Sequence, residues 1–411
     1  MENDLIVASR IVQQIVDGKN IDKIFMENIS AKNNVSLVKD IVYGSIRNYY
    51  LYEAQLDQLL KSEIKSKDIK YLLINAIYQL NHQAIKKFTI VNQNVEASKK
   101  INQKLSNFVN AILRNYLRKQ NEINEVNERD VNYSYPQWWV DKLKKQYEDY
   151  EEILRVGNTR GNLVIRINKR KTTEGEYLDL LEKHNIEYVK IISDKYIQIQ
   201  NEKDIKKLPK FMDGFFYVQD PGAQLAVNFL DLKDEMSVLD LCASPGGKAT
   251  HMLEEYNINL DCYDISAERL NLIKDNLGRL GHHAKILKNL ELKSQYDRVL
   301  VDAPCSGSGV VRRHVDIKMM RKEEDIKKFQ NQQLDLLKKG WKLLKKNGKL
   351  LYITCSIFEE ENKQVVENFL KTENDIQIGD IKIPESFMFI NSQLIPNREH
   401  DGLYFKLFIK N

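Results

Sequence analysis

The string at residues 237–250 constrains the fold of this 411-residue chain more than any other segment. An apolar run ends at Asp240, a turn with Gly246 and Gly247 follows, and residues 248–256 have the pattern of a helix. This order is typical of an open α/β sheet that binds a nucleotide-like ligand, because glycines admit the ligand close to the backbone and helix amides point toward it. Neither standard phosphate signature is present, so the ligand need not be a phosphate.

The next predicted strand, residues 260–265, carries an acid 24 residues after Asp240. An acid at a spacing of roughly 20 accepts ribose hydroxyls in dinucleotide-binding folds, so Asp264 is the candidate for ribose binding. The alternative role is helix capping, because either Asp264 or Ser266 can cap the helix predicted over residues 267–277. The two roles are compatible.

Two cysteines follow two further apolar runs. Residues 296–302 form a predicted strand that ends at Asp302 and leads to Cys305, while residues 350–353 lead to Cys355. Chemistry in open α/β sheets collects at the carboxyl ends of strands, so these thiols can face a common cleft despite their separation in sequence. A thiol pair in a cleft indicates covalent catalysis. The alternative is two buried cysteines that pack as small hydrophobic side chains.

Together the strings DLCASPGGKAT, YDIS, VDAPCSGSG and YITCS resemble the S-adenosylmethionine-dependent RNA 5-methylcytosine methyltransferases. The closest resemblance is to the RsmB (Sun/Fmu) group, which acts on small-subunit (16S) ribosomal RNA. The string FVNAILR resembles the NusB-like domain of that group, and YPQW and FYVQDPG resemble its connecting segments. The resemblance implies a Rossmann-like class I methyltransferase domain of α/β fold, an N-terminal all-α NusB-like domain and a small α/β connecting domain.

Apolar periodicity predicts the same three parts. The domains expected are 1–130, 131–210 and 211–411. In the first, apolar stripes with a helical period cover residues 5–16, 35–52, 69–80 and 108–117, and a polar linker is predicted at 119–127. In the second, the pattern predicts strands at 163–167, 188–192 and 196–199 and a helix at 174–184.

The resemblance implies roles for individual residues of this chain. It makes Cys355 the nucleophile, gives Cys305 a part in product release, and places Asp302 near both cytosine and cofactor. The implied cofactor-binding residues are Cys242, Ala243, Ser244, Pro245, Gly246, Gly247, Lys248, Asp264, Asn289 and Asp302, and the implied RNA-binding residues are Lys248 and Arg313. Spacing alone does not decide which cysteine attacks, since the Pro-Cys thiol does so in the analogous DNA enzymes. Asn289 stands where the family normally has an acid near the adenine, so the charge is lost while a carbonyl acceptor remains.

The expected reaction explains these residue types. C5 of cytosine is a poor nucleophile toward a sulfonium methyl group, and a thiolate that adds to C6 converts the ring to an enamine-like species that can attack. A carboxylate near ring N3, which suits Asp302, can supply or hold the proton there. A base, for which the second thiolate is a candidate, must then remove the C5 proton before the thiol is eliminated.

The distribution of charge along the chain indicates which segments contact RNA. The net charge is +4 (19 − 15) in residues 1–130, +2 (16 − 14) in 131–215 and −1 (28 − 29) in 216–411, so the first two segments are expected to hold ribosomal RNA. A solvated lysine-rich surface is the alternative. Arg166 and residues 169–171 form a candidate phosphate contact, or else a charged loop.

The four cysteines have no regular spacing, which argues against a disulfide framework or a zinc site and favours a reducing cytoplasm. No metal is expected, and no apolar run approaches the ~20 residues of a membrane span. We expect a monomer that acts on ribosomal RNA, either naked or in an early assembly intermediate.

Other functions remain to be distinguished from this one. They are methylation of another RNA (tRNA or 23S ribosomal RNA), methylation of DNA or protein, and a NusB-like RNA-binding adaptor with an inactive methyltransferase domain. The helical first domain and the TCS string disfavour DNA and protein substrates. The intact Asp264, Asp302, Cys305 and Cys355 argue against the adaptor.

Overall fold

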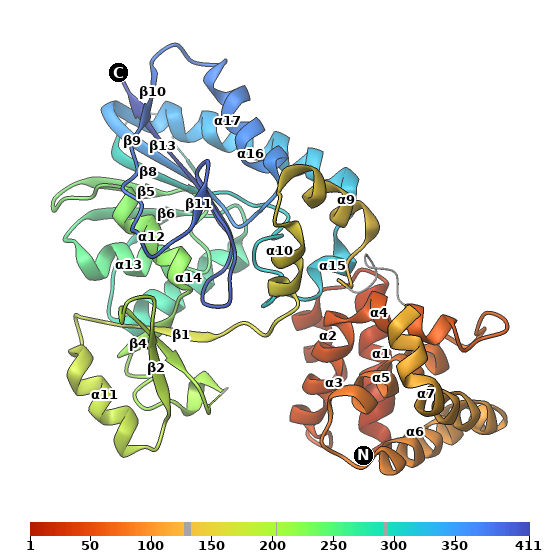
Figure 1. Ribbon diagram of the computed structural model, residues 1–411. Coiled ribbons are helices and arrows are strands. Elements are labelled where there is room, and N and C mark those ends of the chain that lie inside the picture. Colours follow the sequence, from red (N-terminus) through yellow and green to blue (C-terminus); the bar gives the residue numbers. More distant parts are fainter. Residues whose placement is uncertain (127–132, 203, 291–294) are drawn as a thin grey trace. The chain divides into compact units, whose positions relative to one another are not determined.

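The computed structural model of the protein describes residues 1–126, 133–202, 204–290 and 295–411 (Figure 1). The chain gathers into two compact units. Unit 1 consists of Met1–Thr159 and Val311–Glu323, and unit 2 consists of Arg160–Val310 and Glu324–Asn411. The chain therefore leaves unit 2 after Val310, contributes one short segment to unit 1, and returns to unit 2 at Glu324. The domain boundaries at 130 and 210 stay predictions.

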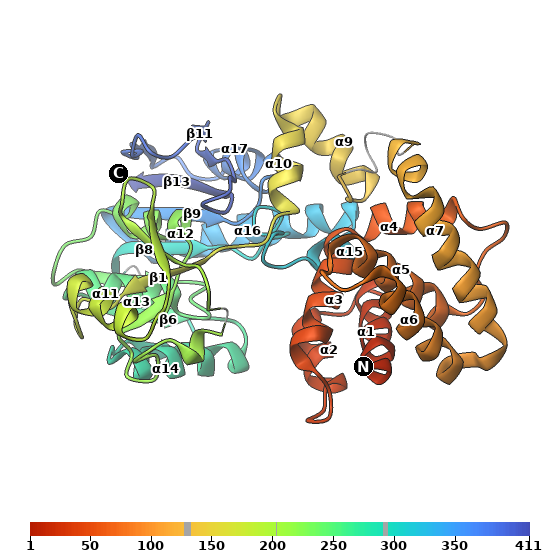
Figure 2. The ribbon, with the colours of Figure 1, turned by 60° about the horizontal axis from the view of Figure 1, so that its bottom comes forward.

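Unit 1 is helical in its described part. Its helices are α1 (Glu2–Val16), α2 (Ile21–Asn28), α3 (Val35–Arg47), α4 (Tyr49–Asp57), α5 (Lys67–His82), α6 (Lys87–Asn102), α7 (Ser106–Val126), α9 (Gln137–Gln146), α10 (Tyr150–Gly157) and α15 (Ile317–Met320). The helix α1 packs against α2, α3, α5 and α6 (Figure 2). The predicted apolar stripes form the core, in which Leu5, Ile11 and Ile15 of α1 are buried because they share one face of the helix.

The apolar stripe at residues 35–52 is helical and is divided at Asn48 between α3 and α4; the Asn48 side-chain amide donates to the Gly44 carbonyl and so competes with helical bonding. One sequence prediction in unit 1 is wrong. The polar stretch expected as a linker continues α7 as far as Val126, because Ile123 is buried in the helical core and its Lys, Gln and Glu residues favour helix. Asn127, the last residue of that stretch, lies outside the described residues.

The segment Val311–Glu323 is built into the core of unit 1. Val315 is fully buried among its apolar side chains, and the Asp316 carboxylate accepts hydrogen bonds from the Ile21 amide (3.1 Å) and the Asn20 side chain (3.2 Å) at the start of α2. These contacts tie the segment to the helical unit by both apolar packing and polar bonds.

Lys318 of α15 is buried in this unit with only 1% of its surface exposed. Its ammonium group donates to the carbonyl oxygens of Arg47 (2.5 Å) and Ser134 (2.8 Å) and to Oδ1 of Asn158 (2.8 Å), and it lies 4.4 Å from the ring centroid of Tyr135. Each ammonium proton thus has an acceptor, which offsets the cost of burying the charge.

In unit 2 the larger sheet has the strand order β11-β12-β13-β9-β8-β5-β6-β7, with β10 also paired to β13. Its strands are β5 (Ser237–Asp240), β6 (Asn259–Tyr263), β7 (Lys285–Leu287), β8 (Tyr296–Asp302), β9 (Leu344–Thr354), β10 (Ile376–Gly379), β11 (Phe389–Ile390), β12 (Gln393–Leu394) and β13 (Leu403–Lys410). The pairs β5–β6, β6–β7, β5–β8 and β8–β9 are parallel, whereas β13 runs antiparallel to β9. The predicted strand at 296–302 is confirmed residue for residue.

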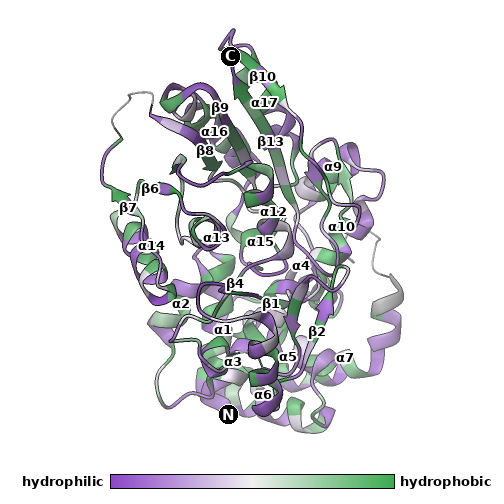
Figure 3. Ribbon diagram, turned by 90° about the vertical axis from the view of Figure 1, so that its left-hand side faces the viewer, coloured by the Kyte–Doolittle hydropathy of each residue, from purple (hydrophilic) through white to green (hydrophobic). Residues whose placement is uncertain are grey.

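Helices cover both faces of this sheet. They are α12 (Pro221–Phe229), α13 (Gly247–Glu255), α14 (Ala267–Leu280), α16 (Glu323–Leu343) and α17 (Lys363–Leu370). One cluster joins Leu351 of β9 to α12, α13 and α14, and a second joins Tyr352 to α16 and α17, because successive strand residues point to opposite faces. Burial on both faces explains the unbroken apolar runs of β8 and β9, which carry the hydrophobic colour in Figure 3.

A smaller antiparallel sheet precedes the larger one in unit 2, with the order β2-β3-β1-β4 and α11 packed on it. Its elements are β1 (Leu163–Ile167), α11 (Glu174–Lys183), β2 (Tyr188–Ile191), β3 (Tyr196–Ile199) and β4 (Phe216–Val218). This confirms the predicted strands and helix to within a residue at their ends.

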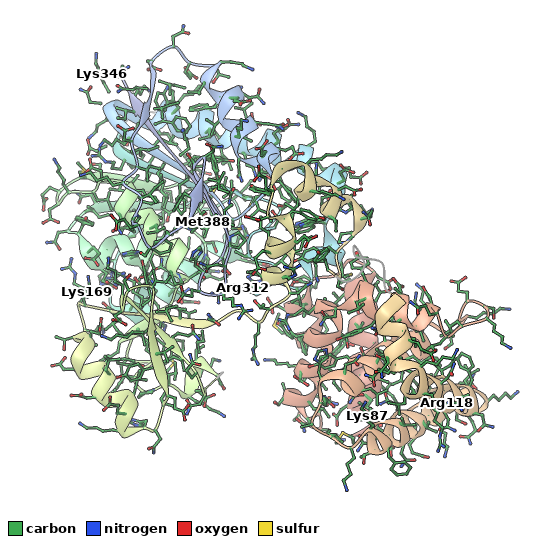
Figure 4. The ribbon with its side chains drawn as sticks, viewed as in Figure 1. Lys87, Arg118, Lys169, Arg312, Lys346 and Met388 are labelled. Carbon is green, nitrogen blue, oxygen red and sulfur yellow. The ribbon has the colours of Figure 1, made fainter. Side chains whose placement is uncertain are left out.

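Three of the four basic residues at the end of β1 bind protein groups, which argues against the phosphate contact considered from the sequence. Arg166 donates to Glu254 of α13 (2.7 Å), Lys169, labelled in Figure 4, pairs with Glu255 (2.5 Å), and Arg170 donates to the Glu254 carbonyl (3.0 Å). Their charges therefore attach the smaller sheet to the end of α13.

Replacing Lys318 with Met is expected to destabilise the protein by about 2 kcal/mol or more, because buried carbonyl acceptors are left without a donor. Thermal unfolding of the full chain measures the effect. Lys32→Met, at an exposed lysine of the same unit, is the matched control. Equal melting temperatures for Lys318→Met and the control would contradict this account of α15.

Candidate active site

The carboxyl ends of the parallel strands bring the predicted residues to one edge of the larger sheet. Asp240 ends β5, Asp264 follows β6, Asp302 ends β8 and Cys355 follows β9. The chain runs from β5 outward to β6 and β7, and then crosses to β8 and β9 on the other side of β5. Such a reversal opens a crevice at the carboxyl ends of the strands, which is where ligands bind in open α/β sheets.

The glycine turn between β5 and α13 adopts the conformation that its sequence predicts. Gly246 has φ +99° and is the residue that precedes α13, which explains why a glycine stands there. A Cβ added to Gly247 would meet no atom within 4 Å. The Ala243 amide donates to the Tyr263 carbonyl (3.0 Å), so the turn is tied to the end of β6.

Asp240 is a buried carboxylate at the end of β5, just before this turn. It is 1% exposed, and neither of its oxygens makes a hydrogen bond of acceptable geometry within the described part of the chain. Burial and the nearby charges of Asp302 and Asp264 raise its pKa to about 7, although Lys248 acts in the opposite direction. Burial and the Asp240 charge also raise the pKa of the Cys242 thiol well above its usual value, so that thiol stays neutral.

Asp264 is buried at the end of β6, with its Oδ1 accepting from the Ser266 amide (3.1 Å) and its Oδ2 3.8 Å from Arg269. Ser266 caps α14 by accepting from the Arg269 amide, so the capping role falls to the serine. Ile265 beside it has 84% of its surface exposed. Asn289 is exposed in the bend after β7, two residues beyond Leu287.

The two thiols lie together, with the Sγ atoms of Cys305 and Cys355 3.2 Å apart. The bond to Cys355, burial and the charge of Glu361 raise the pKa of Cys305 well above its usual value. Cys305 is therefore a neutral thiol that can donate to its neighbour. The juxtaposition expected from the strand order is confirmed.

Lys248 and Asp302 form an ion pair in which Nζ and Oδ2 are 2.5 Å apart. Burial lowers the pKa of Lys248, but Asp302 and Asp240 outweigh it and the pKa is raised above the usual lysine value. Lys248 therefore carries a proton within reach of Asp302, and its pKa also responds to the charge of Cys355. Arg313, the other predicted RNA-binding residue, lies in the turn before α15 in unit 1.

Sequence reasoning missed two features of this edge. Glu361, in the short helical turn Glu359–Glu361, is fully buried behind the thiols. The Gly309 amide donates to the Cys355 carbonyl (2.8 Å), and a Cβ at Gly309 would lie 2.2 Å from the Gly402 carbonyl oxygen. The only sequence signal was an acidic run just after TCS and repeated glycines just after DAPCS.

Fold and site together define a class I methyltransferase domain preceded by a helical domain and a small α/β domain. Comparisons with known proteins agree part by part. The family model described as 16S rRNA methyltransferase RsmB/F matches residues 227–409, that of the RsmF/B-like ferredoxin-like domain matches 135–206, and the NusB family matches 5–118.

Relatives match over the whole length. The probable ribosomal RNA small subunit methyltransferase B of Coxiella burnetii is 33% identical over 98% of both chains, and that of Yersinia enterocolitica is 32% identical over 98% of both. The crystal structure of PH0851 covers 99% of both chains with a TM-score of 0.78 at 24% identity, which shows the shared fold. The chain belongs to the ribosomal RNA small subunit methyltransferase B family.

A test of the buried Asp240 follows from its raised pKa. Between its ordinary value of about 4 and about 7, the folded protein keeps a proton that the unfolded chain has lost, so stability falls as the pH rises through this window. Asp240→Asn removes that titration. The stability of the variant relative to the wild type should therefore increase from pH 4 to pH 7 and level off above it.

Melting temperatures of both proteins across this pH range, without ligand, give the measurement. A difference that does not change with pH would show that Asp240 is ionised throughout.

Proposed function

We propose that the protein transfers a methyl group from S-adenosylmethionine to C5 of a specific cytosine in small-subunit (16S) ribosomal RNA. The observation that carries the proposal is the pair of thiols 3.2 Å apart, at the sheet edge that also holds the Lys248–Asp302 ion pair. The names of the relatives support an rRNA substrate. The cytosine and the covalent route rest on the thiols, because a thiol adduct is what C5 of a pyrimidine needs.

The residues around the glycine turn fit S-adenosylmethionine. Open space over Gly247 admits a ligand to the backbone, and the buried unpaired Asp240 offers a carboxylate to a cationic ligand. Asp264 would accept the ribose hydroxyls, and the exposed Ile265 would cover one face of the adenine. The backbone of residues 242–248 and Asn289 complete the proposed site. NSun6 from Pyrococcus horikoshii, similar in fold at 17% identity and a TM-score of 0.59, was solved with the analogue SFG.

When bound, S-adenosylmethionine supplies an electrophilic methyl group on a sulfonium. Cys355 forms the bond to C6, and the displaced electron density reaches ring N3, which takes a proton held by the Lys248–Asp302 pair. C5 is then nucleophilic and accepts the methyl group. After the C5 proton leaves, the bond between C6 and Cys355 breaks and its electrons return to the sulfur. The N3 proton returns to the Lys248–Asp302 pair, which leaves neutral 5-methylcytosine.

Cys305 is suited to the release step. The bond to Cys355 is the largest cause of its raised pKa, and that bond is lost once the Cys355 sulfur is bonded to carbon. With that bond gone, Cys305 would release its proton to water, and the resulting thiolate would take the C5 proton.

RNA contacts are proposed for Lys248 and Arg313 and for the basic NusB-like domain. The substrate would be naked ribosomal RNA or an early assembly intermediate, bound by a monomer in the cytoplasm. Within the described residues no helix is long and apolar enough to cross a membrane.

Substitution of each cysteine distinguishes the roles of the two thiols. Cys355→Ala should lower the rate of methyl transfer by several powers of ten and form no covalent species, because the ring is never activated. Cys305→Ala should allow attack and methylation but slow the elimination, which leaves the enzyme bonded to its RNA. Incubation with S-adenosylmethionine and 16S ribosomal RNA, followed by a denaturing gel, shows the adduct as a slowly migrating band.

An adduct formed by Cys355→Ala would reverse the assignment of the two thiols. Transfer to tRNA or 23S ribosomal RNA, with none to 16S ribosomal RNA, would overturn the substrate. If neither variant forms an adduct, the release role of Cys305 is wrong.

Asp264→Ala should weaken S-adenosylmethionine binding by about 1.5–3 kcal/mol, because a hydrogen bond to a charged carboxylate is lost. Calorimetric titration measures the dissociation constant. Asp275→Ala, at an exposed acid of α14, is the control. An unchanged constant for Asp264→Ala would rule out the ribose role.

A further inference from the structure

A carboxylate that the proposed chemistry does not use lies directly behind the two thiols. Glu361 has no exposed surface, and it lies in the short helical turn Glu359–Glu361 that continues the chain after Cys355. A buried carboxylate is costly unless its oxygens are hydrogen-bonded, so the bonds it makes are the first question.

Both oxygens of Glu361 bind the residues that follow the cysteines. Oε1 accepts from the Ser306 amide (2.8 Å), and Oε2 accepts from the Ser306 hydroxyl (2.5 Å) and from the Ser356 hydroxyl (2.6 Å). Ser306 is the residue after Cys305, and Ser356 is the residue after Cys355. A single carboxylate thus joins two loops that are fifty positions apart in sequence.

A second layer of bonds fixes the carboxylate itself. Gln333 of α16 donates to Glu361 Oε1 (3.0 Å) and to the Pro304 carbonyl (2.9 Å), and Tyr352 donates to the Glu361 backbone carbonyl (2.6 Å). Ser308 adds a hydroxyl contact to Ser356 (3.0 Å). Gln333, Ser306 and Ser356 have no exposed surface, so water does not compete for these bonds.

We propose that Glu361 is a positioning residue, which holds the Cys305 and Cys355 thiols within contact by accepting a hydrogen bond from the serine after each. Charge-assisted bonds are shorter and roughly twice as strong as neutral ones, and here they lie one residue from each sulfur. Glu361 does not touch the reacting atoms. The juxtaposition of the thiols is independent of the proposed methylation, and only its catalytic consequence rests on that function.

A carboxylate suits this place better than an amide. The Ser306 amide, both hydroxyls and Gln333 all point donors at Glu361, and a carboxylate accepts at every one of its lone pairs. A glutamine would present an NH₂ group to the two hydroxyls and force them to reverse. Burial raises the pKa of Glu361 while these bonds oppose the rise, and its charge adds to the raised pKa of Cys305.

Phenylarsine oxide measures the juxtaposition without any methyl transfer. Its trivalent arsenic bonds to two thiols and its oxygen leaves as water with the two thiol protons, so no oxidant or reductant is needed. Wild-type protein should form this bridge, whereas Cys305→Ala and Cys355→Ala should not. Glu361→Ala should weaken the bridging affinity about tenfold or more, and Glu361→Gln should lie between Glu361→Ala and the wild type.

The matched control is Glu254→Gln, which alters another buried carboxylate of unit 2, bound to Arg166 and Tyr217. It should leave the bridging affinity unchanged, even where its melting temperature falls as far as that of Glu361→Gln. Bridging by folded Glu361→Gln at the wild-type affinity would overturn the proposal. An equal loss in Glu254→Gln would also overturn it, because the effect would then be general destabilisation.

The catalytic consequence has a separate readout. In methyl transfer to 16S ribosomal RNA, Glu361→Gln should lower kcat and leave the KM for RNA unchanged, since the thiols are misplaced and the RNA surface is intact. A raised KM with unchanged kcat would contradict a positioning role. If the wild type itself methylates no RNA while the arsenical results hold, the proposed function is wrong and the role of Glu361 in holding the thiols stands.

Discussion

The reversal of strand order beside β5 is the constraint on which the site depends. Because β6 and β7 lie on one side of β5 and β8 and β9 on the other, the carboxyl ends of these strands form the kind of switch point at which ligands bind in open α/β sheets. Asp240, Asp264, Asp302 and Cys355 all stand at those ends. The two-sided burial of these strands holds their ends in place, since helices pack on both faces and the apolar runs cannot shift in register without exposing core residues.

Charge is distributed over this edge in a way that suits a cationic ligand and a single thiolate. Asp240, Asp264 and Asp302 outnumber Lys248; burial first, and the excess negative charge after it, raise the pKa of Asp240 and Cys242. A bound sulfonium would relieve part of that repulsion. Glu361 acts in the same sense at the thiols: after the bond to Cys355 and burial, its charge adds to the raised pKa of Cys305, while its bonds to Ser306 and Ser356 join the two cysteine loops.

The segment Val311–Glu323 follows the Cys305 loop in the sequence but belongs to unit 1. Val315 supplies apolar contact, Asp316 binds the start of α2, and Lys318 fills a polar site in the interior. The helical unit is thus completed by residues far from its own part of the sequence.

Apolar runs, the glycine turn and the acids that end the strands were sufficient to predict the α/β fold and the placement of Asp264, Asp302, Cys305 and Cys355 after the carboxyl ends of its strands. Such features are local, so periodicity and short strings reveal them. Sequence could not reveal that Lys119–Val126 extends α7, since burial of Ile123 against other helices decides it. Nor could it reveal that Arg166 binds Glu254, or that Glu361 joins two serines. These bonds connect residues distant in sequence, and only the packed tertiary structure brings a donor to an acceptor where water is excluded.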